Sequence, residues 1–251
     1  MSLIDPNKKY DKLVTFGCSF TEGWLYKEQG TWGDFLSQNL DCTHINKGGQ
    51  SSSNLSISNN IIRYCETNNM SNTCVGVQWS EWSRREFWVE SQKKYFTFNL
   101  ATVTDKNFNR DQNSELLKFK DNIDLFLHMW FDDQENIIRT IYSMILIKNY
   151  LKSNNIDFIM FEGVGSILDK FYPCNRSTLN EETILLSDEH KLKLFDDVEF
   201  FKKYGDMRTY MKKSDLINDS EFGHPPPKYA KWWADEIYNY LKKTYEKTGN
   251  N

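Results

Sequence analysis

An α/β fold built around a short parallel sheet is the fold class that this 251-residue sequence predicts. Four apolar runs have the length and composition of buried strands, at residues 12–16, 42–46, 73–79 and 156–161. Segments whose apolar residues recur at helical spacing alternate with these runs. Such alternation is typical of parallel sheets, because each helix carries the chain back to the edge where the previous strand began.

Helices are expected at residues 32–40, 57–64, 132–152 and 226–245, with a further short helix near residues 198–204. Thr31 is the expected N-cap of the first helix, because its hydroxyl can accept a hydrogen bond from the helix backbone. The third helix opens with Asp132 and Glu135, whose spacing resembles a capping box. Pro226 or Pro227 can begin the last helix, since proline is favoured in a first turn.

Apolar residues predict the buried faces of the two longest helices. The face of the 132–152 helix is predicted to comprise Ile138, Ile141 and Ile145, adjoined by Tyr142 and Met144. The face of the last helix is predicted to comprise Trp233, Ile237, Tyr240 and Leu241. Both helices are therefore expected to pack on the sheet.

Residues 83–130 interrupt the alternation with a segment rich in aromatic and polar side chains. We interpret this segment as an insertion after the third strand, a lid or a partner surface, within a single domain that spans residues 1–251. Its aromatic residues are expected to form the core of the insertion. The alternative is a platform on which a carbohydrate ring stacks.

Charge and cysteine content exclude several classes of function. The net charge is −4 and no long basic cluster occurs, so nucleic acid is not an expected partner. The five cysteines lack CxxC spacing and His128 and His190 lack ligand partners, so neither disulfides nor a metal site is expected. His44, inside the second strand, is expected to be a packed or edge histidine. No apolar run reaches the roughly 18 residues of a membrane helix, and residues 1–12 carry no apolar signal, so a cytoplasmic protein without membrane contact is predicted.

Two short motifs contain the residues expected to carry chemistry. Ser19 lies in residues 17–21 (GCSFT), directly after the first strand, where the carboxyl ends of parallel strands form ligand crevices. His224 lies in residues 221–225 (EFGHP), just before the last helix. A serine hydroxyl becomes nucleophilic when a base such as histidine removes its proton, so we predict a Ser19–His224 pair. The alternative for Ser19 is a helix N-cap, and Cys18 is expected to be a buried structural thiol.

These motifs resemble the signature blocks of the SGNH (GDSL-type) hydrolases. Residues 17–21 resemble the first block, G-D-S-x-[ST], with Cys18 in place of Asp. Residues 46–54, an Asn followed by a small-residue loop, resemble the second block. Residues 221–225 resemble the final D-x-x-H-P block, with Glu in place of Asp, and Trp32 opens a helix as it often does in that family.

The resemblance implies a three-layer, flavodoxin-like fold and an ester hydrolase that works through an acyl-enzyme. Ser19 would be the nucleophile and His224 the base. The carboxylate that orients His224 would be Glu221, with Asp219 as second choice and Asp215 as third. Backbone N–H groups of Ser19 and of the second-block loop would stabilise the oxyanion.

The loop donor falls at Gly49 or at Ser51, depending on how the second block is aligned. In the third block, G-x-N-D, the family has an Asn that completes the oxyanion hole, and residues 75–85 contain no Asn. Ser80 or Gln78 could donate a hydrogen bond instead, and a neighbouring arginine could supply positive charge. The Trp-Ser-x-x-x-Arg run here resembles divergent SGNH-like proteins of phage genomes.

We therefore predict a cofactor-independent serine esterase, and the resemblance implies a small-molecule or carbohydrate ester, such as an acetylated sugar, as substrate. Two alternatives use the same residues differently. The missing third-block Asn favours a catalytically degenerate SGNH-like binding or structural module, for instance in a virion. An O-acyltransferase would pass the acyl group from Ser19 to an acceptor alcohol.

Overall fold

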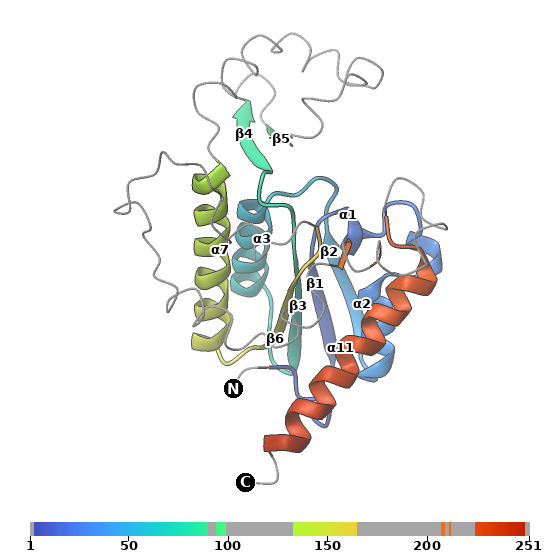
Figure 1. Cartoon of the computed structure of the whole chain (residues 1–251). Coiled ribbons are helices and arrows are strands. Elements are labelled where there is room, and N and C mark those ends of the chain that lie inside the picture. Colours follow the sequence, from blue (N-terminus) through green and yellow to red (C-terminus); the bar gives the residue numbers. More distant parts are fainter. Residues whose placement is uncertain are drawn as a thin grey trace, which may run out of the picture.

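The computed structural model describes residues 3–89, 94–98, 133–164, 207, 208, 211 and 224–248. A four-stranded parallel sheet with the order β2-β1-β3-β6 forms its centre (Figure 1). The strands are β1 (Lys12–Gly17), β2 (Thr43–Gly48), β3 (Thr73–Trp79) and β6 (Asp157–Glu162). A first strand between the second and the third is the order of flavodoxin-like sheets, so the predicted fold class is confirmed.

Helices cover both faces of the sheet (Figure 1). They are α2 (Trp32–Asn39) and α11 (Pro227–Thr248) on one face, and α3 (Asn54–Thr67) and α7 (Asp133–Ser153) on the other. Leu13 and Val14, neighbours in β1, belong to the two opposite cores, because successive side chains of a strand point to opposite faces. The fold therefore has the three layers that the sequence predicts.

Aromatic side chains fill the core beneath α2 and α11. The ring of Trp32 lies 4.9 Å from that of Phe161, which lies 5.6 Å from that of Trp233, measured between centroids. All three side chains are buried, and each such burial contributes roughly 1.5–3 kcal/mol or more. Gly76 in β3 makes room for this packing, since a Cβ there would lie 2.7 Å from the Trp32 ring.

The buried face of α7 differs by one position from the predicted one. Buried residues recur at Ile137, Ile141, Met144, Ile147 and Leu151, whereas Ile138 and Ile145 are half-buried and Tyr142 is exposed. Isoleucines at neighbouring positions leave two possible apolar stripes on this helix, and packing against α3 selects the one that contains Ile137. Within the described residues, no helix combines the length and the apolar character needed to cross a membrane.

Other element boundaries also differ from the predicted ones. β2 extends to Gly48, beyond the predicted end at residue 46, because it pairs with β1 as far as Gly17. α3 begins at Asn54, three residues early, and Ser53 caps it by accepting a hydrogen bond from the N–H of Ser56. α11 begins at Pro227, as predicted, and its predicted face is buried apart from the half-buried Tyr240. Asp132 and residues 198–204 lie outside the described residues.

An antiparallel hairpin is the described part of the predicted insertion. It consists of β4 (Arg85–Val89) and β5 (Lys94–Phe98), beyond the end of β3 (Figure 1). The Glu86 carboxylate accepts a hydrogen bond from the N–H of Ser53, the N-cap of α3, at 3.1 Å. Arg85 donates to Glu135 at 3.2 Å and also to Asn136, both near the start of α7. The hairpin is therefore tied to the ends of two helices.

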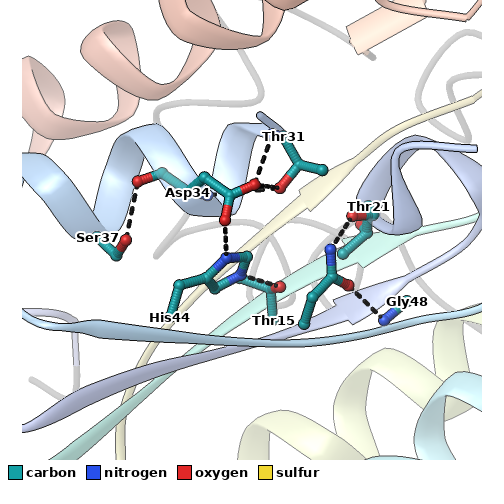
Figure 2. Close-up of polar contacts among 8 residues, drawn as sticks. Thr15, Thr21, Thr31, Asp34, Ser37, His44 and Gly48 are labelled. Atoms are coloured by element: carbon teal, nitrogen blue, oxygen red, sulfur yellow. Dashed lines mark hydrogen bonds and ion pairs between the residues drawn. The ribbon is translucent and has the colours of Figure 1, made fainter. Parts of the chain in front are cut away.

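A chain of hydrogen bonds links α2 to the sheet (Figure 2). Thr31 caps α2 as predicted: its hydroxyl accepts from the N–H of Asp34, and Asp34 Oδ2 accepts from the N–H of Thr31 at 2.7 Å. Asp34 Oδ1 lies 2.7 Å from His44 Nδ1, and His44 Nε2 lies 2.8 Å from Thr15 Oγ1. The His44 side chain is 8% exposed, and a Cβ on Gly33 would overlap its ring. His44 is therefore a packed histidine, one of its two predicted settings.

The pKa of Asp34 reflects this arrangement. Burial alone would raise it, but hydrogen bonds from His44 and Thr31 lower the pKa from its ordinary 3.8 to about 2. A carboxyl group whose pKa is lowered in the folded state stabilises the fold at pH values above its ordinary pKa. That contribution is lost as the pH falls through the folded-state pKa.

Replacing Asp34 should therefore destabilise the fold in a pH-dependent way. We expect Asp34→Asn to lower the free energy of unfolding by about 1–2 kcal/mol near neutral pH, because the capping carboxylate and its bond to His44 are lost. The difference from wild type should shrink between pH 3.8 and about 2, where the wild-type carboxylate becomes protonated. Urea unfolding across this range measures the difference. Glu28→Gln, which removes an exposed carboxylate, is the control, and a constant difference for Asp34→Asn down to the lowest pH would contradict the prediction.

Candidate functional site

The loops that follow the parallel strands meet at one edge of the sheet. Gly17 at the end of β1 pairs with Gly48 at the end of β2, and Trp79 at the end of β3 pairs with Glu162 at the end of β6. Ligand crevices of open α/β sheets lie at this edge. All sequence-predicted site residues within the described part of the chain belong to this edge or to the segment just before α11.

Ser19 and His224 meet at this edge, although 205 residues separate them in the sequence. His224 Nε2 lies 2.9 Å from Ser19 Oγ, a hydrogen-bond distance. Ser19 is the first residue of α1 (Ser19–Glu22), and only Cys18 separates it from the end of β1. His224 precedes the two prolines before α11. The hydroxyl can donate to Nε2 when the ring carries its proton on Nδ1.

The turn between β1 and α1 requires a glycine at position 17. A Cβ on Gly17 would overlap Thr21 Oγ1 and lie 2.9 Å from the carbonyl oxygen of Gln78. Thr21 Oγ1 donates to Gln78 Oε1 at 2.6 Å and accepts from Trp32 Nε1 at 3.2 Å. α1 is therefore held close against β3. Ser19, on the same short helix, contacts His224 instead.

Gln78, a predicted oxyanion donor, lies inside the protein. Its side chain is fully buried, and Nε2 lies 3.3 Å from Cys18 Sγ and 3.4 Å from the carbonyl oxygen of Trp79. A Cβ on Gly163 would overlap this amide nitrogen. The amide hydrogens of Gln78 are therefore directed to Cys18 and to the backbone of Trp79. Cys18, 0% exposed, has the buried setting expected of a structural thiol.

The end of β2 is fastened to α1. Asn46 Nδ2 donates to the carbonyl oxygen of Thr21 at 2.6 Å, and its Oδ1 accepts from the N–H of Gly48 at 2.9 Å; Thr21 and Gly48 are labelled in Figure 2. The N–H of Gly49 donates to the carbonyl oxygen of Gly17 at 3.0 Å. Of the two predicted loop donors, Gly49 therefore already uses its N–H in a hydrogen bond to the backbone of Gly17.

Ser51, the other predicted loop donor, lies in a tight turn. The N–H of Ser52 donates to the carbonyl oxygen of Gly49 at 3.3 Å, and Ser51 between them has a φ of 56°. A positive φ at the third position is the pattern of a type II turn. Ser51 is exposed, and its N–H has no hydrogen-bond partner among the described residues.

The loop after β3 is fixed by Asn54. Its Oδ1 accepts from the N–H of Ser80 at 2.7 Å, and its Nδ2 donates to the carbonyl oxygen of Ser80 at 3.0 Å. The Ser80 hydroxyl is buried and has no hydrogen-bond partner within the described ranges. Arg84 Nη1 lies 3.5 Å from the carbonyl oxygen of Ser52, so the guanidinium bridges the loops after β2 and β3.

Two aromatic rings contact the imidazole of His224. The ring centroids of Phe20 and Trp24 each lie 5.1 Å from that of His224, in edge-to-face geometry. Phe20 is 6% exposed, whereas Trp24 is 46% exposed. The described part of the site therefore has one covered and one open aromatic neighbour beside the histidine.

Sequence reasoning missed Asn54 and Trp24 as parts of this edge. Asn54 looked like one more polar residue of a small-residue loop, and only its pairing with Ser80 distinguishes it. Trp24 belongs to no motif, although its position close after the predicted nucleophile was a usable signal. Glu221 and Asp219, the predicted orienting carboxylates, lie outside the described residues. No group of three His, Cys, Asp or Glu in the described ranges could hold a metal ion.

Comparison with solved structures finds distant similarities to several proteins. One is a GDSL-like lipase from Bacteroides thetaiotaomicron, with 14% identity and a TM-score of 0.47, covering 96% of this chain and 93% of that one. Another is the esterase EstA from a Pseudoalteromonas species, with 13% identity and a TM-score of 0.46, covering 94% and 99%. A member of the lipolytic protein G-D-S-L family from Veillonella parvula has 10% identity and a TM-score of 0.44, covering 91% and 96%.

No curated protein matches the chain. A family model does match, over residues 20–189, which is more than half of the sequence. Its description is that of a family of unknown function. The chain therefore belongs to the family DUF6071.

Proposed function

We propose that this protein is a serine ester hydrolase that works through an acyl-enzyme. The observation that carries the proposal is the 2.9 Å contact between Ser19 Oγ and His224 Nε2 at the carboxyl edge of a parallel sheet. A hydroxyl and an imidazole in this relation form the minimal unit of nucleophilic catalysis. Ser19 keeps 8% of its surface exposed at this edge of the sheet.

The proposed reaction has two steps. In the first, Ser19 Oγ bonds to the ester carbonyl carbon while its proton passes to His224 Nε2. The C–O bond to the alcohol then breaks, and the proton on Nε2 goes to the departing alcohol oxygen. In the second, water gives a proton to Nε2 as its oxygen bonds to the acyl carbon. The bond between the acyl carbon and Ser19 Oγ then breaks, the proton on Nε2 returns to Ser19 Oγ, and the free acid leaves.

Two backbone N–H groups are the proposed oxyanion donors. The first is that of Ser19 itself, which donates no hydrogen bond to any of the described residues. The second is that of Ser51, which we prefer to that of Gly49 because the Gly49 N–H already donates to Gly17. The buried hydroxyl of Ser80 is the proposed third donor, since the amide of Gln78 is engaged elsewhere. Glu221, or else Asp219, remains the proposed carboxylate partner of His224.

A second candidate is a binding or structural module that retains this fold without turnover. The absence of an Asn in the loop after β3, together with the engaged amide of Gln78, favours it. An O-acyltransferase remains compatible with the same Ser19–His224 pair. Product analysis with an added alcohol separates transfer from hydrolysis, because transfer yields a new ester where hydrolysis yields only acid.

The first test compares wild type with Ser19→Ala. We expect wild type to hydrolyse 4-nitrophenyl acetate and to be labelled by a fluorophosphonate, and Ser19→Ala to lose the labelling and at least about 10³-fold in kcat/KM, because no nucleophile remains. Ser37→Ala, which removes a buried hydroxyl of α2, is a matched control that should retain activity. No labelling of well-folded wild type would contradict the hydrolase and favour the binding module.

The oxyanion assignment predicts different outcomes at positions 51 and 80. Ser51→Gly should retain kcat within about threefold, because the proposed donor is the backbone N–H and glycine tolerates the positive φ. Ser80→Ala should lower kcat by about 10-fold or more, with little change in KM, because a transition-state hydrogen bond is lost. Steady-state kinetics measure both. Unchanged kcat in Ser80→Ala would remove Ser80 from the oxyanion hole.

Asn54 should matter for both stability and rate. Asn54→Ala leaves the buried N–H and carbonyl of Ser80 without partners, so we expect the free energy of unfolding to fall by about 2–4 kcal/mol. We also expect kcat to fall, because the loop after β3 is no longer fixed. Urea unfolding and kinetics measure the two effects, with Asn60→Ala on the exposed side of α3 as control. Equal stability of the two variants would contradict this role.

A further inference from the structure

The side chain of Trp24 combines contact with the ring of His224 and exposure to solvent. Its ring contacts the His224 imidazole, with 5.1 Å between centroids, and 46% of its surface is nevertheless exposed. Large aromatic side chains are usually buried, because exposing them to water costs free energy. The exposed part of an indole that lies against the histidine of the site offers a ring surface to a ligand.

The position of Trp24 is fixed by the backbone of the nucleophile. Gly23, with a φ of 77°, ends α1 in the left-handed conformation and donates its N–H to the carbonyl oxygen of Ser19 at 2.9 Å. The N–H of Trp24 donates to the same oxygen at 3.3 Å. The next turn is closed by the N–H of Tyr26, which donates to Gly23 at 2.8 Å. The indole therefore has a fixed relation to both Ser19 and His224.

The chemistry of the pair determines which part of an ester would meet this indole. The proton that His224 takes from Ser19 must pass from Nε2 to the oxygen of the departing alcohol. The alcohol therefore lies on the histidine side of the reacting carbonyl, next to the rings that contact the imidazole. Phe20 is 6% exposed and offers almost no surface, so of the two described rings beside His224 it is Trp24, 46% exposed, that can meet the alcohol.

We propose that Trp24 selects the alcohol part of the ester by stacking on a ring that this alcohol carries. The proposal rests on the hydrolase function proposed for Ser19 and His224, and it narrows the substrate class to esters of ring-bearing alcohols. An indole binds a flat apolar ring face, which both an aromatic ring and the C–H face of a pyranose provide. The acyl part lies on the other side of the carbonyl and does not meet Trp24.

The test uses protection of Ser19 from a small alkyl fluorophosphonate, which needs no turnover. Benzyl alcohol and a methyl pyranoside are the two ring-bearing probes, and ethanol is the ring-free control. We expect a ring-bearing alcohol to slow labelling of wild type by at least about fivefold at concentrations where ethanol has no effect. Protection by benzyl alcohol alone identifies an aromatic alcohol, and protection by the pyranoside alone identifies a sugar.

Three variants separate stacking from a merely structural role. Trp24→Ala should lose the protection, measured as the ratio of its labelling rates with and without the alcohol, and Trp24→Phe should regain part of it. Tyr142→Ala, which removes an exposed ring on the opposite face of the sheet, should keep the protection in full. An unchanged protection ratio in Trp24→Ala would overturn the proposal, because Trp24 would then support His224 without binding the alcohol.

Hydrolysis supplies the second readout. The ratio of kcat/KM for the protecting alcohol's acetate to that for ethyl acetate should fall about 10-fold in Trp24→Ala. The ratio of butyrate to acetate esters of one alcohol should not change. Labelling of wild type without protection by either ring-bearing alcohol overturns the role of Trp24 and leaves the hydrolase standing. Absence of labelling in wild type overturns the hydrolase itself.

Discussion

The approach of β1 to β3 at Gly17 is the constraint on which the rest of the site depends. With no side chain at this position, the end of the strand lies against the carbonyl oxygen of Gln78 and the side chain of Thr21, and only Cys18 separates it from α1. The hydroxyl of Thr21, in α1, donates a hydrogen bond to the side chain of Gln78. The indole N–H of Trp32 donates to the same hydroxyl. Any Cβ at Gly17 would force α1 away from the sheet, and the hydroxyl of Ser19 would move with it.

The packing of α11 places His224 next to Ser19. Joining two points 205 residues apart costs chain entropy on the order of 5 kcal/mol, since the cost grows as the logarithm of loop length. One hydrogen bond contributes only about 1 kcal/mol and could not hold the pair together. Trp233, Ile237 and Leu241 are fully buried, and at roughly 1.5–3 kcal/mol each they offset that cost. The contact between Ser19 and His224 therefore results from the packing of the core beneath α11.

Sequence reasoning succeeded where a residue's role follows from local chemistry. The four strands, the Thr31 cap and the start of the last helix follow from apolar runs, a hydroxyl and a proline. It was less successful where several local solutions compete: α7 carries two possible apolar stripes, and only contact with α3 selects one. The engaged N–H of Gly49 and the burial of Gln78 could not be foreseen, because both result from pairing between segments distant in the sequence. The Ser19–His224 contact was predicted from motif order, and its orienting carboxylate remains a prediction.

The hydrogen bonds among Thr15, His44 and Asp34 have a consequence for how such sites are recognised. A hydroxyl, an imidazole and a carboxylate follow one another there at 2.8 Å and 2.7 Å, the spacing of a hydrolytic triad. Thr15 nevertheless lies in the middle of β1, with its side chain between the sheet and α2. It is 0% exposed, so no substrate carbonyl can reach its hydroxyl. A search by interatomic distance alone would select this chain of groups as readily as Ser19 and His224. Accessibility at the edge of the sheet is what distinguishes a reactive hydroxyl from a structural one.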